Sequence, residues 1–180
     1  QRSFRHGVEH SLDPGLRAQA GVLARALRAS DTGDLGLNDT GPDALVRTRR
    51  ALTPFGGGVP DDTALRIAAH VATLVRDGDC IQTGIGAIPA AILAALANRS
   101  DLGMHSGLID DGGMALIERG VMTGRMKPID RGLHITGMAL GSAALLEWRA
   151  DRPEVAFRGA DHTHEVGVIR DIPNFVSINS

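Results

Sequence analysis

The stretch Ile81-Gln82-Thr83-Gly84-Ile85-Gly86-Ala87-Ile88-Pro89 decides the fold class of this 180-residue chain. A short strand ends in two closely spaced glycines, and Pro89 is a residue type favoured in the first turn of a helix. The stretch His105-Ser106-Gly107-Leu108-Ile109-Asp110-Asp111-Gly112 then brings a cluster of polar side chains to the end of the next strand. Ligands of open α/β sheets bind at the carboxyl ends of the strands, so the two stretches predict one shared crevice.

Strands and helices alternate from residue 60 onward. We expect strands over residues 80–82, 102–106, 133–136, 155–157 and 175–178, and helices over residues 62–78, 89–97, 113–119, 143–148 and 163–169. Apolar spacing in the first helix predicts that its core-facing side chains are Leu65, Ala68, Ala69, Ala72 and Val75. This alternation is typical of an α/β fold with a mainly parallel open sheet and flanking helices.

Residues 1–58 do not show this alternation, and we expect them to form an N-terminal segment, a linker or a remnant beside an α/β domain over residues 59–180. A short helix is predicted over Leu16–Leu27, and Gly56-Gly57-Gly58 is typical of a hinge. The last predicted strand runs to Ile178 with no helix after it. Because a parallel sheet needs cover on both faces, we expect the fold to be completed by a second half or a partner chain.

Composition narrows the class of protein. The formal net charge of −2 argues against a nucleic-acid partner, whose footprint is a basic excess. The sequence contains no run of about eighteen apolar residues, so we do not expect a membrane span. Cys80 is the single cysteine, which excludes an internal disulfide and fits a reducing compartment. We therefore expect a cytoplasmic protein that binds neither nucleic acid nor membrane.

The glycine turn is a candidate binding site formed by Gly84, Ile85, Gly86 and Ala87. Glycines let the backbone approach a ligand closely, and the following helix offers free N–H groups to an anion or an oxyanion. A dinucleotide fingerprint needs a third glycine, but Pro89 stands in that position. The spacing alone leaves two hypotheses open: a binding turn, or a turn that only connects strand to helix.

These motifs together resemble one enzyme family. Residues 77–93, 105–112, 116–121, 141–142 and 176–180 are similar to the acetyl-CoA hydrolase and 4-hydroxybutyrate CoA-transferase family, over about the middle portion of its longer chain. The resemblance implies a CoA-transferase-like fold and coenzyme A or acyl-CoA as substrate, with a small carboxylate as acceptor and no metal. It also implies an oxyanion held by backbone N–H groups near Ile85.

The chain departs from the family at the residue that performs the chemistry. The family's nucleophile is a glutamate, and its position falls on Gly107, directly after His105-Ser106. Three hypotheses follow. Another side chain could act, with Asp110 or Asp111 as the carboxylate or His105 as the general base of a hydrolysis. Acyl transfer could run directly between a bound acyl-CoA or acyl carrier and its acceptor. The chain could also be a catalytically silent subunit.

Each candidate catalytic residue also has a structural interpretation. Asp110 and Asp111 stand where a helix N-cap is expected. Ser106 lacks a nucleophile elbow and is predicted to bond a strand-end backbone group. His105 fits a buried core position as well as a site, Glu118 fits a surface ion pair, and Cys80 fits the core.

The segment Asp161-His162-Thr163-His164-Glu165 contains several residue types that bind metals. The segment is predicted to enter a helix, where residues two apart diverge. We therefore expect a polar rim of the cleft and no metal site. The combined expectation is a transferase or thioester hydrolase acting on acyl-CoA, assembled as a homodimer or with a second polypeptide. The alternative is a silent structural subunit of a heteromeric transferase.

Overall fold

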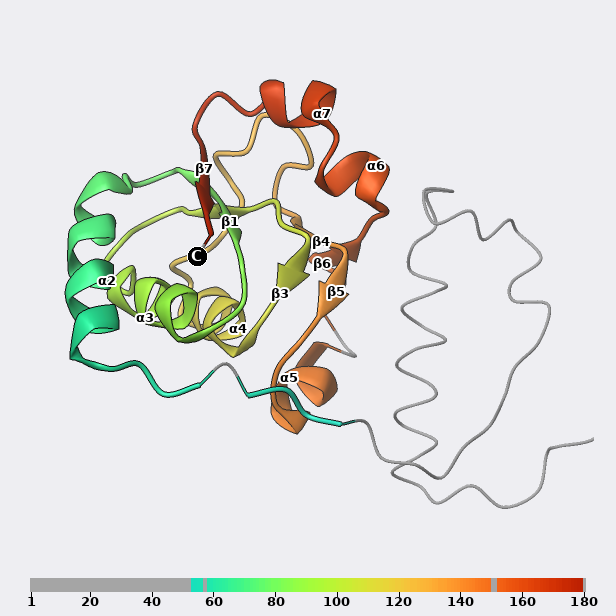
Figure 1. Cartoon of the computed structure of the whole chain (residues 1–180). Helices are drawn as coiled ribbons and strands as arrows, with labels where there is room; N and C mark the ends of the chain where they lie inside the picture. Colours follow the sequence, from blue (N-terminus) through green and yellow to red (C-terminus); the bar gives the residue numbers. More distant parts are fainter. Residues whose placement is uncertain (1–52, 57, 150–151, 180) are drawn as a thin grey trace, which may run out of the picture.

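The computed structural model describes residues 53–56, 58–149 and 152–179 (Figure 1). The helix predicted over residues 16–27 lies outside the described residues. In chain order the elements are α2 (Asp62–Leu74), β1 (Cys80–Thr83), α3 (Ala87–Ala95), β2 (Gly103–Met104), β3 (Leu108–Ile109), α4 (Asp111–Glu118), β4 (His134–Thr136), β5 (Met138–Ala139), α5 (Ala143–Trp148), β6 (Val155–Phe157), α6 (Ala160–Thr163), α7 (Val166–Arg170) and β7 (Phe175–Ile178). The predicted α/β class is confirmed.

Strand β1 is the centre of the sheet that positions the glycine turn. It pairs in parallel with β2 on one side and with β7 on the other. Ile81 lies opposite both Met104 and Val176, as expected for neighbouring strands. Because β1 ends at Thr83, Gly84 stands at its carboxyl end, which confirms the predicted location of the turn.

The parallel pairing is divided among three short sheets within the described residues. Strands β3 and β5 form one pair, and β4 and β6 form another, both parallel. The sheets meet after β2, where His105 forms a bridge with Ile135 and the Ser106 N–H donates to the Ile135 carbonyl at 3.0 Å. Strands β3 and β5 were not predicted, because two residues are too short to show an alternating pattern.

The predicted core face of α2 is partly wrong. The helix begins as expected, because the Asp61 carboxylate accepts a hydrogen bond from the Ala64 N–H at 2.8 Å. Ala64 and Ala68 are its buried residues, whereas Leu65 is 53% exposed and Ala69 is also exposed. The helix is rotated so that its small alanines, and not Leu65, pack closely against α3.

The remaining helices refine the predicted boundaries. Helix α3 begins two residues before Pro89, at Ala87. Helix α4 begins at Asp111 and not at Gly113, with Asp110 as its N-cap. Helix α5 begins at Ala143 as predicted, with Ser142 as its N-cap. The helix predicted over residues 163–169 is divided into α6 and α7, because His164 leaves the helical conformation.

The hydrophobic core lies where α2, α3 and α4 pack against β1 and β2 (Figure 1). Ile81 and Leu93 are completely buried there, and such burial contributes roughly 1.5–3 kcal/mol for each side chain. Cys80 is buried as predicted, and this burial raises the pKa of its thiol to about 11. No helix in the described part of the chain is both long and apolar enough to cross a membrane.

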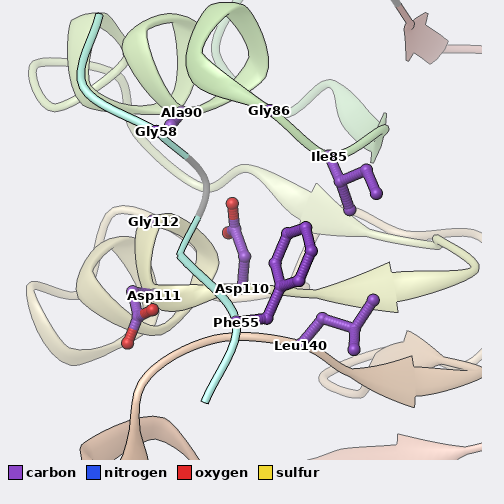
Figure 2. Close-up of a pocket in the computed structure, with 9 residues that line it drawn as sticks. All are labelled: Phe55, Gly58, Ile85, Gly86, Ala90, Asp110, Asp111, Gly112 and Leu140. Carbon is purple, nitrogen blue, oxygen red and sulfur yellow. The ribbon is translucent and has the colours of Figure 1, made fainter. Parts of the chain in front are cut away.

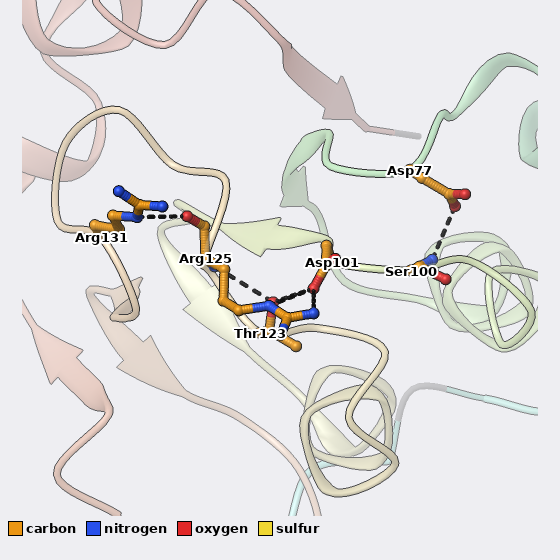
Figure 3. Close-up of polar contacts among 6 residues, drawn as sticks. All are labelled: Asp77, Ser100, Asp101, Thr123, Arg125 and Arg131. Carbon is orange, nitrogen blue, oxygen red and sulfur yellow. Dashed lines mark hydrogen bonds and ion pairs between the residues drawn. The ribbon is translucent and has the colours of Figure 1, made fainter.

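A polar network fixes the loop that follows α4 (Figure 3). The Asp101 carboxylate accepts from the Thr123 hydroxyl at 2.9 Å and from the Arg125 Nε at 2.8 Å. The Arg131 Nε donates to the Arg125 carbonyl at 2.8 Å, which closes the far side of the loop. The loop is therefore held against the beginning of β2.

Lys127 extends from this loop into the protein interior. Its ammonium group donates to the Met104 carbonyl at 3.1 Å and to the Leu133 carbonyl at 2.9 Å. The side chain is 2% exposed, and burial lowers its pKa. Lys127 thus ties the end of β2 to the beginning of β4, just beneath the polar cluster at residues 105–112.

Candidate functional site

A pocket lies at the carboxyl end of β1, between the beginnings of α3 and α4. It is lined by Phe55, Gly58, Ile85, Gly86, Ala90, Asp110, Asp111, Gly112 and Leu140 (Figure 2). The structure therefore brings two of the predicted turn residues, Ile85 and Gly86, to two of the predicted catalytic residues. The other two turn residues, Gly84 and Ala87, flank the pocket without lining it.

Gly86 gives the turn its shape. Its φ of +124° lies in a region that side-chain-bearing residues rarely adopt. Helix α3 starts directly after it, so the N–H groups of the first turn of α3 have no partners within the helix. Ile85 is 45% exposed beside the pocket. The backbone here is open to a ligand that carries negative charge.

Asp110 and Asp111 have different environments, although they are adjacent. Asp110 caps α4 by accepting from the Gly113 N–H at 2.8 Å, and Figure 2 shows its carboxylate pointing into the pocket. Burial raises the pKa of Asp110, despite the opposing effect of that hydrogen bond. The Asp111 carboxylate accepts from the N–H of Ser142 at 2.9 Å and from its hydroxyl. Asp111 therefore connects α4 to α5. The helix-capping role predicted for this pair is confirmed for Asp110.

His105 and Ser106 lie beneath the site and do not line the pocket. Ser106 is fully buried, and its Oγ lies 3.3 Å from both the N–H and the carbonyl of Thr83. This is the structural role that the sequence predicted for Ser106. His105 is also fully buried, and burial lowers its pKa. Its Nε2 lies 3.0 Å from the His162 carbonyl.

The histidine segment docks onto His105. His162 Nε2 lies 2.7 Å from the Asp130 carboxylate, and the His105 and His162 rings are 5.3 Å apart. Among the described residues, His105, Asp130 and His162 bring atoms able to bind a metal within 4.8 Å of one another. The hydrogen bonds account for this arrangement, so we do not assign a metal site to it.

Gly107, where the resemblance implies the family's glutamate, faces His164. A Cβ atom added at Gly107 would lie 2.7 Å from His164 Nε2 and would contact His164 Cε1 even more closely. Such distances are incompatible with any side chain at residue 107 unless the imidazole moves. The Gly107 carbonyl accepts from the Gly137 N–H at 3.2 Å, which fixes the backbone. An imidazole therefore occupies the space into which a side chain at residue 107 would extend.

Three residues that shape the site were not singled out from the sequence. Phe55 lines the pocket and donates its N–H to the Gly141 carbonyl at 3.0 Å. Asp130 holds His162, and Lys127 supports the strand ends. Lys127 is the single lysine of the chain, and this could have drawn attention to it. A lone lysine among many arginines suggests a position that needs a compact ammonium group on a flexible side chain.

The comparisons agree with the motifs. The chain is 32% identical over 141 residues to a probable butyrate:acetyl-CoA coenzyme A-transferase of Syntrophomonas wolfei, covering 77% of this chain and 32% of the relative. It is 32% identical over 148 residues to a 4-hydroxybutyrate coenzyme A transferase of Clostridium kluyveri, covering 82% and 34% of the two chains. No protein-family model matches the sequence.

A solved structure supports the same fold. The 4-hydroxybutyrate CoA-transferase of Porphyromonas gingivalis superposes with a TM-score of 0.65 and 34% identity, covering 71% of this chain and 33% of that one. The described region is a CoA-transferase-like α/β unit. The resemblance to the acetyl-CoA hydrolase and 4-hydroxybutyrate CoA-transferase family is thereby confirmed, and the chain spans about a third of the length of these relatives.

Proposed function

We propose that this chain forms the thioester-binding centre of an acyl-CoA-dependent transferase or thioester hydrolase that acts on small carboxylic acids. One observation supports it above the others: the pocket joins the glycine turn at Ile85 and Gly86 to the carboxylate of Asp110. Perturbed carboxylates that face a pocket are common at functional sites. The similarity to CoA-transferases suggests acyl-CoA as the ligand class.

In this proposal the turn binds the thioester carbonyl. The N–H groups around Ile85 and Gly86 stabilise the negative charge that develops on the carbonyl oxygen when the thioester is attacked. Asp110 faces the same pocket and helps to position the acyl group or its acceptor. Coenzyme A leaves as the thiol, and no metal takes part in the proposal.

The proposal excludes a glutamyl thioester at residue 107, since Gly107 has no side chain. Asp111 is engaged by Ser142, and His105 lies fully buried under the His162 carbonyl. Both are therefore poorly placed as nucleophile or base. The predicted catalytic role of Asp110 stays a proposal, as does direct transfer between two bound partners.

A second candidate function is a catalytically silent subunit, and Gly107 favours it. Strand β7 has a partner only on its β1 side among the described strands, and its Phe175 and Val176 are half-buried. We propose that a second polypeptide or a second copy of the chain covers this edge. The domain boundary at residues 58 and 59 and the cytoplasmic location also stay predictions.

Binding measurements test the proposed function. Titration calorimetry with acetyl-CoA and butyryl-CoA should show saturable binding to the protein. Gly86→Ala should weaken the affinity at least about tenfold, because a side chain at a φ of +124° forces the turn to move. Gly120→Ala is the matched control, since Gly120 also has a positive φ, +68°, but lies beyond the opposite end of α4.

Two results would contradict the proposal: no saturable binding by the unchanged protein, or an equal loss of affinity in both glycine variants. Intact-mass measurement after incubation with acyl-CoA should show no covalent adduct on residue 107. An adduct on Asp110 would change the mechanism but keep the site.

A further inference from the structure

We propose that His164 replaces the family's missing glutamate, acting as the general base of a water-dependent thioester hydrolysis over Gly107. This inference rests on the proposed function, because it requires the thioester to bind at the glycine turn. It assigns a catalytic residue directly after α6, in a segment that the motifs of the resemblance do not include. It also assigns hydrolysis as the reaction, in place of transfer through an enzyme-bound thioester.

The first argument is the location of the imidazole. His164 Nε2 lies 2.7 Å from the place where a Cβ of residue 107 would be. Ser106, one residue earlier, contacts Thr83 at the end of β1 through its Oγ at 3.3 Å. Residue 107 is therefore one residue away from the contact that joins β2 to the beginning of the glycine turn. The end of β2 therefore lies at the same edge of the sheet as the turn, and His164 contacts Gly107 there, next to the residues that follow β2 and outside the set that lines the pocket.

The second argument is that α6 is held in place by its neighbours. The Asp130 carboxylate binds His162 Nε2 at 2.7 Å, and His105 Nε2 lies 3.0 Å from the His162 carbonyl. Asp130 itself has a φ of +48°, an uncommon conformation for a residue with a side chain. These contacts lie two residues before His164, so they fix the backbone from which its imidazole extends.

The third argument is the hydrogen bond on the other ring nitrogen. The Thr163 Oγ1 lies 2.7 Å from His164 Nδ1 and 3.2 Å from the Gly159 carbonyl. The hydroxyl has one hydrogen, and we assign it to the carbonyl, which cannot itself donate. Nδ1–H then donates to Oγ1, which leaves Nε2 without a proton on the side of Gly107. An orienting partner on one nitrogen and a free lone pair on the other are what a histidine base requires.

The chemistry balances with water as the second reactant. His164 Nε2 accepts a proton from water while the water oxygen bonds to the thioester carbonyl carbon. The carbonyl electron pair moves onto oxygen, where the N–H groups of the turn stabilise it. The intermediate collapses, the carbon–sulfur bond breaks, and the proton on the imidazolium passes to the leaving thiolate. The products are a carboxylic acid and coenzyme A, and His164 is again neutral.

Access favours His164 over His105, the histidine that the sequence suggested as a general base. His164 is solvent-exposed, so water can reach its ring, whereas His105 is completely buried. The side chains of Asp110 and Asp111 are each committed to a hydrogen bond at a helix N-terminus. Of the four candidate catalytic residues predicted from sequence, none therefore has the combination of access, orientation and position that His164 has.

The test measures thiol release from acetyl-CoA and butyryl-CoA by the protein, with binding measured in parallel by calorimetry. His164→Ala should lower the hydrolysis rate at least about 100-fold, the usual contribution of a positioned base, while the affinity for acyl-CoA changes little. His164→Gln should be equally slow. Added imidazole should raise the rate of His164→Ala, because the vacated position is open to solvent. His70→Ala is the matched control, since His70 is an exposed histidine on α2 and should keep full activity.

The outcomes separate this inference from the proposed function. Absence of acyl-CoA binding by the unchanged protein would overturn the proposed function and the inference together. Binding without hydrolysis would overturn only the inference and would support the silent-subunit alternative. Hydrolysis by His164→Ala at the rate of the unchanged protein would also overturn the inference alone, because some other group would then be the base.

Discussion

Two regions of the molecule meet at Gly107, and they are built differently. The β2–β1–β7 sheet with its glycine turn is held by regular parallel pairing and a buried core. The α6–α7 region has two short helices, no fully buried apolar residue among those the structure describes there, and a few polar contacts through His162 and Thr163. The sheet keeps the features that the chain shares with CoA-transferases. The residue that fills the space at Gly107, His164, comes from the less strongly packed α6–α7 region.

The largest expected effect concerns stability in the two regions. Ile81→Ala in β1 should lower the free energy of unfolding by about 3 kcal/mol, because the side chain is completely buried and its loss leaves a cavity. Val166→Ala in α7 should change it by less than about 0.5 kcal/mol, because Val166 is 74% exposed. Urea unfolding followed by circular dichroism measures both. Equal losses would show that the two regions are packed alike.

The next effect is a pH dependence of stability that arises in β4, outside the α6–α7 region. Burial lowers the pKa of His134 in β4 to about 4, so the folded protein binds a proton there less readily than the unfolded chain does. Stability is therefore complete above the unfolded pKa of about 6.5 and falls progressively as the pH drops toward 4. Between pH 7 and pH 5 the loss from His134 is about 1–2 kcal/mol.

His134→Leu should flatten this pH dependence, and urea unfolding at pH 7 and pH 5 is the measurement. His105 is also buried with a lowered pKa and contributes in the same direction, so some slope remains in the variant. His70→Leu, at an exposed position of α2, is the control and should retain the full slope. An unchanged slope in His134→Leu would show that His134 is not buried in neutral form.

A smaller effect is expected where the α6–α7 region is attached. Asp130→Gly should cost about 1 kcal/mol of stability by removing the bond to His162, and it should slow thioester hydrolysis several-fold by loosening α6. Glycine accepts the φ of +48° without strain, so the backbone is preserved. Asp130→Asn keeps an acceptor for His162 and tolerates the same φ, so its losses should be smaller. If Asn and Gly behave alike, the hydrogen bond does not position α6.

Much of the sheet side was predictable from sequence because its signals are local. The run Cys80-Ile81-Gln82 before a glycine pair predicted β1, and the predicted beginnings of α2 at residue 62 and α5 at residue 143 are correct. The apolar face of α2 was misjudged because Leu65 fits the helical period, while close helix packing selected the smaller Ala64. Hydrophobic periodicity identifies a helix more reliably than it identifies the residues at its contact.

The candidate site was only partly predictable because its key contact joins distant residues. The resemblance implies that Gly107 stands at the nucleophile's position, and the structure places His164 against Gly107. No local sequence pattern links residues 107 and 164. His162 and His164 are two residues apart in a predicted helix, so their side chains are expected to point in different directions. His164 becomes visible as a candidate only when α6 is docked on His105 through the His162 carbonyl.

The most direct test of the account is whether residues 107 and 164 compete for one space beside the thioester. Gly107→Glu and the double variant Gly107→Glu with His164→Ala should be incubated with acetyl-CoA, and their intact masses should be measured before and after borohydride treatment. The account predicts a glutamyl-CoA adduct that forms faster in the double variant than in the single variant, because the His164 imidazole must shift before a glutamate side chain fits at residue 107. An adduct that forms as readily in Gly107→Glu alone would contradict it.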